Sequence, residues 1–250
     1  MASAKSNELM SDLESAVVFR LFADRQALTL TISEQIAAHV GDEIIRGQRQ
    51  PGESLNEQRL ADTFEVSRGP VRDAIRILER EGLVTIFARR GAFVTDLTVD
   101  EVREIFEIRV GLLEIVARKV AAAHTDTYLK TLRAGVAKLE RLARLDDDQG
   151  EYAETSYRLS ILSVRHVDNK RLTAMLTALS LQTLRYSRIS LAPKARRRAS
   201  AMLWRAGLSA LEKGDANTYV AISRQRVEES GQAVVGRLSA SAETTERRRA

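Results

Sequence analysis

The sequence predicts a mainly α-helical fold in two domains, and three observations support this. The 250 residues include only 3 prolines and 13 glycines, while Ala, Leu, Arg and Glu are abundant, as is typical of helical proteins. Thr31–Glu34 and Thr98–Glu101 both have the Thr-x-x-Glu pattern of a capping box, which begins a helix. Two short runs typical of β-strands, 83–87 and 92–95, lie between these boxes. We therefore expect a small N-terminal domain with a β-hairpin, followed by an all-helical domain.

Changes of pattern divide the chain into four segments. We expect a polar tail with a short amphipathic piece at 1–25, a first domain at 26–96, a helical bundle at 97–238 and an unfolded Ser/Thr/Ala/Arg-rich tail at 239–250. The first segment could be disordered or could pack on a partner, and its composition does not decide between the two.

Cysteine content and charge exclude several classes of protein. The chain has no Cys, so it has neither disulfides nor a thiol nucleophile, which suits a reducing cytosol. No run approaches the ~20 apolar residues of a membrane span, and the N-terminal residues lack the basic-then-apolar layout of a signal peptide. The net charge is +5, yet 26–96 holds nine Arg and no Lys against eleven Asp and Glu, a net charge of −2. Any nucleic-acid binding there must depend on where the arginines lie.

The region Leu55–Thr95 has the pattern of two short helices followed by a hairpin. Asn56 is expected to cap the first helix and Ser67 the second, with a tight turn at Glu65 between them. Apolar residues of the second helix repeat at helical spacing and should pack inward: Val71, Ala74, Ile75 and Leu78.

Arginines mark the opposite face of this second helix. Arg68, Arg72 and Arg76 recur every four residues, so they form a basic ridge rotated away from the apolar stripe. The hairpin tip, Ala88–Gly91, is also basic. These features together predict a winged helix-turn-helix, whose second helix fits the major groove and whose wing reaches phosphates or the minor groove. The alternative is that the ridge is only a solvated helix face.

Three motifs follow one another within residues 32–94: I-R-G-x-x-x-P-G-E-x-L, L-A-D-x-F-x-V-S-R-x-P-V-R-D-A-I-R-x-L-E-x-E-G-L and R-x-G-x-F-V. With them the chain resembles the DNA-binding domain of GntR-type bacterial transcription regulators. The resemblance implies double-stranded operator DNA as a partner, contacted by Gln58, Ser67, Arg68, Gly69, Arg72, Arg90 and Gly91. Gln58 stands where some relatives have an arginine, which reduces the electrostatic contribution at that position.

The chemistry of these positions agrees with the resemblance. Arg68 and Arg72 lie near the start of the presumed recognition helix, where side chains first meet base edges. An arginine that donates two hydrogen bonds to guanine O6 and N7 is worth roughly 1–3 kcal/mol of discrimination. Ser67 and backbone N–H groups at a helix N-terminus suit a phosphate oxygen.

After residue 97 the pattern indicates helices only. The capping box at Thr98 should begin a helix that packs Val102, Phe106 and Leu113 inward. Five further helical segments are expected at Tyr128–Leu145, Glu151–His166, Lys170–Ile189, Lys194–Lys213 and Ala216–Leu238. An all-α antiparallel helical bundle follows from this pattern.

This second domain resembles the effector-binding C-terminal domain (FCD type) of the FadR subfamily of GntR regulators. The residues that carry the resemblance are E-I-R-V-G-L-L-E (Glu107–Glu114), D-N-K-R-L (Asp168–Leu172) and L-x-A-L-E-K-G-D-A (Leu208–Ala216). The resemblance implies a bundle around an effector pocket, which also forms the interface of a homodimer.

Many domains of this type hold a divalent metal with an aspartate and three histidines. The first two positions correspond here to Ser156 and Ser160, or to Glu154 and Arg158 after a two-residue slip; the others correspond to Trp204 and Arg226. At most one carboxylate remains, and a guanidinium has no lone pair for a metal. We therefore expect no metal or other cofactor and a metal-independent pocket.

An effector carboxylate could instead be bound directly by arginine. The candidate effector-binding residues are Arg109, Arg158, Arg185 and Arg226, with Trp204 as an apolar or stacking wall. The alternative is that these arginines only form ion pairs with Glu114, Glu154 or Glu228. The histidines, His39, His124 and His166, fall outside the metal positions and are expected to be structural or surface residues, although His166 could border the pocket.

The expected function is a dimeric, ligand-responsive DNA-binding regulator that recognises a short palindromic operator. Repression is implied by the resemblance alone, whereas an organic-acid effector is expected from the candidate arginines. We also expect a cytoplasmic, nucleoid-associated location, which agrees with the absence of Cys. An enzyme is disfavoured because nothing after residue 97 alternates β and α, and there is no phosphate loop or nucleophile–base pair. An architectural DNA-binding protein without an effector would not need so large a bundle. The segment Asp96–Asp100 is the expected hinge.

Overall fold

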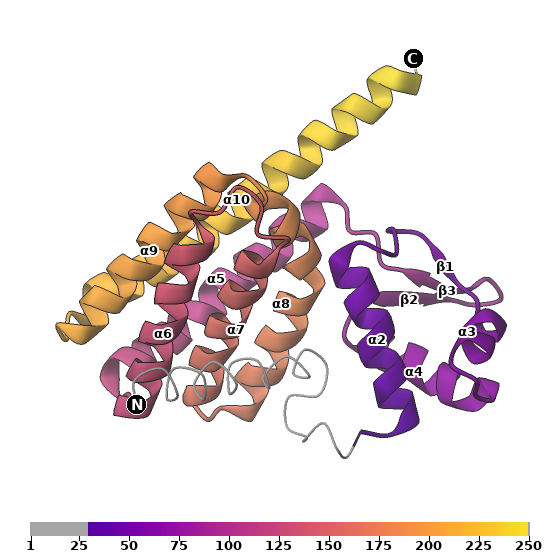
Figure 1. Ribbon diagram of the computed structural model, residues 1–250, viewed down its shortest axis with the longest axis horizontal. Coiled ribbons are helices and arrows are strands. Elements are labelled where there is room, and N and C mark those ends of the chain that lie inside the picture. Colours follow the sequence, from indigo (N-terminus) through magenta and orange to yellow (C-terminus); the bar gives the residue numbers. More distant parts are fainter. Residues whose placement is uncertain (1–29, 250) are drawn as a thin grey trace. The chain divides into compact units, whose positions relative to one another are not determined.

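The computed structural model describes residues 30–249, and the side chains of residues 30–240 (Figure 1). The expected segment 1–25 lies outside the described residues. The described chain forms two compact units that divide between Leu97 and Thr98. Each unit is built around its own core.

The first unit, as far as it is described, contains three helices and three strands. They are α2 (Ile32–Arg46), β1 (Ser54–Leu55), α3 (Glu57–Thr63), α4 (Arg68–Arg80), β2 (Val84–Phe87) and β3 (Gly91–Val94). The capping box before α2 is confirmed, since the Thr31 side chain accepts from the Glu34 amide and the Glu34 carboxylate accepts from Thr31. Ile32, the first residue of α2, is 55% exposed, whereas Ile36, Val40 and Ile44 further along the helix are buried.

Helices α3 and α4 form the expected helix-turn-helix. Asn56 caps α3 by accepting a hydrogen bond of 2.9 Å from the Arg59 amide. Glu65 takes a positive φ of 54° in the turn. The four predicted inward residues of α4 are all buried: Val71, Ala74, Ile75 and Leu78. Ser67 occupies the N-cap position of α4, but its hydroxyl makes no capping bond, so the expectation is correct for position and wrong for the bond.

The sheet is antiparallel with strand order β1-β3-β2. The hairpin pairs Val84 with Val94 and Phe87 with Gly91, in agreement with the predicted wing. Strand β1 was not predicted, because two residues are too short for a strand pattern. It pairs Leu55 with Ala92 and thereby joins the wing to the start of α3.

The second unit, within the described residues, is an antiparallel bundle of six helices (Figure 1). They are α5 (Val99–Ala122), α6 (Asp126–Leu142), α7 (Glu151–His166), α8 (Lys170–Leu191), α9 (Lys194–Glu212) and α10 (Ala216–Arg249). The capping box at Thr98 is confirmed. The segment 239–249, expected to be unfolded, continues α10. Its residues include no glycine or proline, so nothing in the backbone ends the helix there.

Close helix packing makes the core of the bundle. Helix α10 lies along both α5 and α9, and α7 packs against α6 and α8. A Cβ atom at Gly135 would lie only 2.3 Å from Leu159, so this glycine permits α6 to approach α7. Among the described residues, no helix is both long and apolar enough to span a bilayer.

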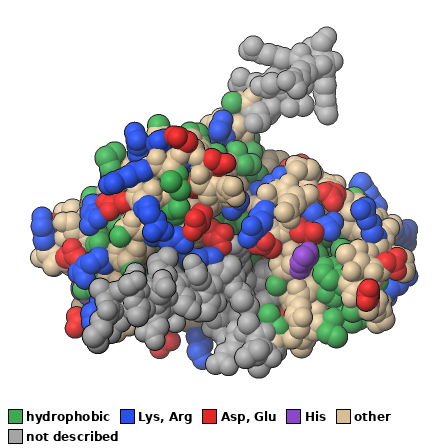
Figure 2. Space-filling model, in the orientation of Figure 1, with side chains coloured by type: hydrophobic (Ala, Val, Ile, Leu, Met, Phe, Trp, Pro, Cys, Tyr) green, Lys and Arg blue, Asp and Glu red, His purple; other side chains and the backbone are tan. Residues whose placement is uncertain are grey.

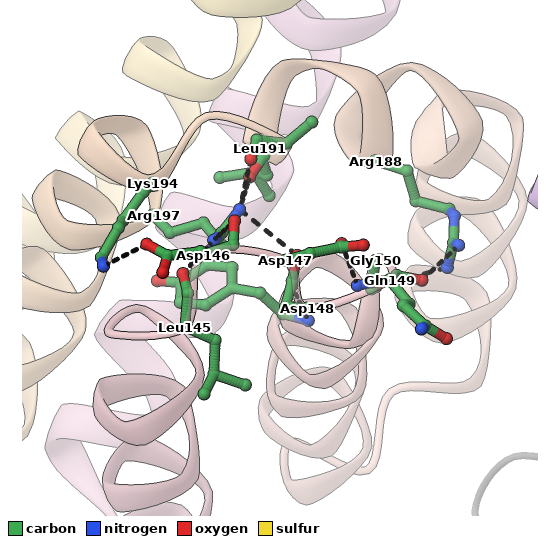
Figure 3. Close-up of polar contacts among 12 residues, drawn as sticks. Leu145, Asp146, Asp147, Asp148, Gln149, Gly150, Arg188, Leu191, Lys194 and Arg197 are labelled. Carbon is green, nitrogen blue, oxygen red and sulfur yellow. Dashed lines mark hydrogen bonds and ion pairs between the residues drawn. The ribbon is translucent and has the colours of Figure 1, made fainter.

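A fully buried arginine closes one end of the bundle (Figure 3). The Arg197 guanidinium donates to the backbone carbonyls of Leu145 (2.6 Å) and Leu191 (3.3 Å), and it lies 3.3 Å from the buried carboxylate of Asp148. The carbonyls of Asp146 and Ala192 accept from it as well. Arg197 therefore joins the α6–α7 loop to the α8–α9 connection.

Candidate DNA interface and effector pocket

The packing of α4 decides which of its side chains face solvent. Because its apolar stripe is buried against the first unit, Arg68, Arg72 and Arg76 remain exposed on the opposite side. Arg68 is the first residue of α4. Next to it lie the backbone amides of the first turn and the hydroxyl of Ser67, which makes no capping bond. The start of α4 thus offers guanidinium, hydroxyl and amide donors on one exposed surface, which is what a phosphate and a base edge require.

A carboxylate from α3 binds two of these arginines. Glu57 Oε2 accepts from Arg68 Nη2 at 2.9 Å and from Arg72 Nε at 2.8 Å. The hydrogen bond from Arg72 is the main reason why the pKa of Glu57 is lowered. Sequence reasoning missed Glu57, which begins α3 directly after the Asn56 cap and lies 11 and 15 residues before its two partners. Gln58, the next residue, donates instead to Asp62 Oδ1 at 2.9 Å within α3.

The wing carries two further predicted DNA-binding residues. Arg90 lies over the rings of Phe87 (5.5 Å) and Phe93 (5.8 Å), so two aromatic side chains support an exposed guanidinium. Gly91 has a φ of 93°, which favours glycine at this turn. Gly69 on α4 has open space around it, since a Cβ atom added there would have no neighbour within 4 Å. Acidic and basic side chains are interspersed over the visible surface (Figure 2), so position rather than net charge distinguishes these donors.

The helical unit has a partly open cavity of about 50 Å³ between α5, α7, α8 and α10. Its polar lining consists of two arginines, one tyrosine and five serines: Arg109, Arg226, Tyr157, Ser156, Ser160, Ser180, Ser187 and Ser230. No aspartate, glutamate or histidine lines it. The cavity therefore has positive charge and hydroxyl donors without an acidic group to neutralise them.

The two lining arginines are held by neutral groups. Arg109 Nη1 donates to Thr183 Oγ1 at 2.8 Å, and its guanidinium lies 4.6 Å from the centre of the Phe106 ring. Arg226 Nη1 lies 3.5 Å from Ser160 Oγ, and its guanidinium stacks 3.4 Å from the centre of the Trp204 ring. Neither guanidinium is paired with a carboxylate in the part of the chain that the structure describes.

Burial affects both of these arginines. It lowers the pKa of Arg109 to about 10, and repulsion from Arg226 acts on that pKa in the same direction. Burial likewise lowers the pKa of Arg226 to about 10, against the opposing effect of Tyr219. Both values lie well above neutral pH, so two positive charges remain in one cavity.

The other candidate effector residues lie outside the cavity lining. Arg158 pairs with Glu154 on α7, and both side chains are nearly buried, at 11% and 12% exposure. Arg185 does not line the cavity. Trp204 lies behind Arg226 and donates from Nε1 to Ser156 Oγ at 3.1 Å. The structure thus brings together Arg109, Arg226 and Trp204 but not Arg158 or Arg185.

Comparison with known proteins places both units in one family. The family model of the bacterial regulatory proteins of the gntR family matches residues 32–94, and the FCD domain model matches residues 104–229. The chain belongs to the GntR family of bacterial regulators, with the GntR-plus-FCD architecture of the FadR subfamily. The resemblance noted from the sequence is thereby confirmed, as is the mainly α-helical fold class.

Individual relatives agree with this assignment. The HTH-type transcriptional regulator YdhC of Bacillus subtilis is 32% identical over 133 residues, which cover 53% of this chain and 59% of YdhC. The gluconate operon transcriptional repressor of Bacillus licheniformis is 30% identical over 112 residues, covering 45% of this chain and 46% of that repressor. The chain therefore spans about half the length of these curated relatives. The E. coli McbR/YncC structure has the same fold, with a TM-score of 0.71 at 18% identity, covering 86% of this chain and all of that one.

Three of the four positions that correspond to the metal ligands of related FCD domains line the cavity, and the fourth, Trp204, contacts two of them. Ser156, Ser160, Trp204 and Arg226 converge, since Trp204 donates to Ser156 and Arg226 contacts both Ser160 and Trp204. Hydroxyls, an indole and a guanidinium do not form a divalent-cation site. Glu154, the alternative carboxylate, is paired with Arg158. These residues do not fit the metal of related FCD domains.

The histidines also lie apart from the cavity lining. His39 packs edge-on against Phe64 at 5.3 Å, and the His124 ring contacts the Val120 carbonyl. His166 stacks on Tyr128 at 4.5 Å, and its Nε2 lies 3.2 Å from the Ala123 carbonyl oxygen. Across the described chain, no three His, Asp or Glu residues are grouped as metal ligands would be.

Proposed function

We propose that this GntR-family regulator is a repressor that binds a short palindromic operator as a homodimer and releases it when a small organic acid enters the FCD domain. The observation that carries the DNA-binding part is the exposed Arg68–Arg72 pair at the start of α4, within the matched GntR region. In this proposal α4 lies in the major groove, the start of α4 binds a phosphate, and Arg90 of the wing contacts the adjacent backbone or minor groove.

The proposed effector is a carboxylate bound without a metal. Arg109 and Arg226 are positive, line one cavity and are unpaired with a carboxylate among the described residues, so an anion between them would replace their repulsion with two charge-assisted contacts. The serine hydroxyls of the lining can donate to the remaining carboxylate lone pairs. A cavity of about 50 Å³ favours a small acid over a bulky one.

Calorimetric titration with short mono- and dicarboxylic acids, with and without EDTA, tests the pocket. We expect binding by the wild-type protein that EDTA leaves unchanged. Arg226→Ala should weaken it by roughly tenfold to a hundredfold, because a hydrogen bond to a charged group is worth about 1.5–3 kcal/mol. Arg226→Lys keeps the charge but loses the planar pair of donors, so it should bind with intermediate affinity.

A matched control lies two residues away on α10. Arg224 is 56% exposed and pairs with Glu228, so Arg224→Ala should leave the affinity for the acid unchanged. Affinity abolished by EDTA would contradict the metal-free site. If no carboxylic acid binds the wild-type protein, the arginine pair does not serve an organic acid.

The proposed dimer uses an exposed face of α5. Glu104, Ile108, Gly111, Ile115 and Arg118 recur at helical spacing on this face, and Ile108 and Ile115 are 50% and 45% exposed. Its middle is apolar, its N-terminal end carries Glu104, and its C-terminal end carries Arg118, which also pairs with Glu114 on the same helix at 2.6 Å. Two copies packed antiparallel about Gly111 would bring Glu104 opposite the partner subunit's Arg118, since both lie seven residues from that glycine.

Analytical ultracentrifugation of charge-reversal variants tests whether this surface forms the dimer. Glu104→Arg should weaken the dimer by about tenfold or more, because like charges would meet twice across a two-fold interface. Arg118→Glu should act similarly, and the double variant should restore the dimer. Lys213→Glu, a charge reversal at the exposed end of α9, serves as the control. A dimer unaffected by either single reversal would exclude this face, whereas a monomeric wild type would exclude the dimer itself.

Control of operator binding by the acid requires that two arrangements of the dimer bind the acid with different affinities. A tenfold loss of operator affinity needs about 1.4 kcal/mol of differential affinity of the effector for two dimer arrangements. The boundary of the two units, between Leu97 and Thr98, falls within Asp96–Asp100, which we propose as the hinge. Operator affinity that no ligand changes would instead favour an architectural DNA-binding protein.

A further inference from the structure

One carboxylate binds both arginines that the proposed function assigns to base recognition. Glu57 is the first residue of α3, and its Oε2 atom alone accepts from Arg68 Nη2 and Arg72 Nε. The three side chains are 31%, 53% and 57% exposed, respectively. Exposed ion pairs contribute little to stability. The main effect of these three residues is therefore to fix the positions of the two guanidinium groups.

The donor atoms used in these two contacts determine which donors of each arginine remain available for DNA. Arg72 uses Nε, so the donors on both Nη1 and Nη2, which point away from the side-chain stem, are not used in this contact. A guanidinium is planar, so fixing it at Nε also fixes the direction of its remaining donors. Two parallel N–H donors are what guanine O6 and N7 accept in the major groove. An arginine held in this way loses less conformational freedom when it meets that base.

The same carboxylate weakens binding to DNA of any sequence. It carries a negative charge, kept ionised by its lowered pKa, beside the donors that approach the phosphate backbone. A negative charge at this point opposes binding to every sequence, because non-specific affinity depends on neutralising phosphates. Only a base that accepts hydrogen bonds from the oriented Arg72 offsets that repulsion. Sites with and without such a base are therefore bound with different affinities, and this difference is specificity.

We propose that Glu57 is a specificity-determining positioning residue, which orients Arg72 toward guanine and weakens binding to DNA that lacks guanine at that position. This inference rests on the proposed DNA-binding function and adds a role for a residue that does not itself need to touch a base. Arg68, held through Nη2, is positioned by the same carboxylate at the neighbouring site.

Selection from a randomised duplex library, followed by affinity measurements on the selected and on unrelated duplexes, tests the proposal. Comparison of wild type with Arg72→Ala identifies the base pair that Arg72 reads. Glu57→Gln should lower the preference for guanine there by roughly five- to tenfold. It should also raise affinity for unrelated duplex by about two- to fivefold, since one repulsive charge is removed.

Two further variants separate orientation from charge. Glu65→Gln removes a carboxylate from the turn between α3 and α4, and it should raise general affinity without changing the guanine preference. Glu57→Asp keeps the charge but withdraws it by one methylene, so it should lower the guanine preference without raising general affinity.

The possible outcomes are distinct. Undiminished guanine preference in both Glu57 variants would overturn the positioning role. So would an equal loss of preference in Glu65→Gln, because charge alone would then explain it. If the wild type selects no sequence at all, the proposed DNA-binding function fails, and this inference fails with it.

Discussion

Arg197→Ala is expected to lower the free energy of unfolding of the helical unit by about 3–5 kcal/mol, as removal of one member of a buried ion pair does. The variant would leave the Asp148 carboxylate, only 4% exposed, without its cation, and would leave the carbonyls of Leu145 and Leu191 without their donor. In a unit of this size the midpoint of thermal unfolding should fall by roughly 6–20 °C. Circular dichroism during heating and in urea measures both quantities.

The same end of the bundle provides a control. Lys194 lies 2.6 Å from Asp146, whose side chain is 95% exposed, so Lys194→Ala should lower stability far less than Arg197→Ala. Arg197→Met combined with Asp148→Asn should recover part of the loss, because it removes the unpaired buried charge. Equal effects of Arg197→Ala and Lys194→Ala would show that burial of this arginine does not matter.

The fold was largely predictable because its signals are local. Capping boxes at Thr31 and Thr98 depend on residues three positions apart, and both mark the helix starts in the structure. The bounds expected for α7, Glu151–His166, are those observed. The two departures in the elements themselves, strand β1 and the C-terminal part of α10, have no strong local pattern in the sequence. Strand β1 exists because β3 lies beside it, and the C-terminal part of α10 continues where composition alone suggested an unfolded tail.

The candidate sites were less predictable because their residues come from different helices. Periodicity places Arg109 and Arg226 on faces of α5 and α10, but only the packing of the bundle brings them to one cavity. The pairing of Arg158 with Glu154, four residues apart, is local and was among the alternatives that the sequence left open. Glu57 was missed because its two partners lie 11 and 15 residues away, across a turn whose geometry the sequence does not specify.

Arg72→Ala is expected to reduce operator affinity by roughly 1–3 kcal/mol per half-site and to relax specificity at one base pair. Arg72 is exposed near the start of α4, and Glu57 orients it there through Nε. Gel-shift titration at fixed salt, on the selected duplex and on duplexes altered at that base pair, measures both effects. Binding of the organic acid should be unchanged, because its proposed site lies wholly within the helical unit.

Arg80→Ala distinguishes recognition from simple loss of positive charge. Arg80 ends the same helix, is 69% exposed and contacts Glu81 at 3.4 Å, so its removal subtracts one charge far from the start of α4. It should weaken binding to all duplexes alike and lower the salt dependence, whereas Arg72→Ala should act chiefly on the selected sequence. Unchanged operator affinity in Arg72→Ala would mean that α4 does not read the operator through this residue. A uniform loss on every duplex would instead assign Arg72 to the phosphate backbone, and with it the carboxylate of Glu57 would lose its role in reading guanine.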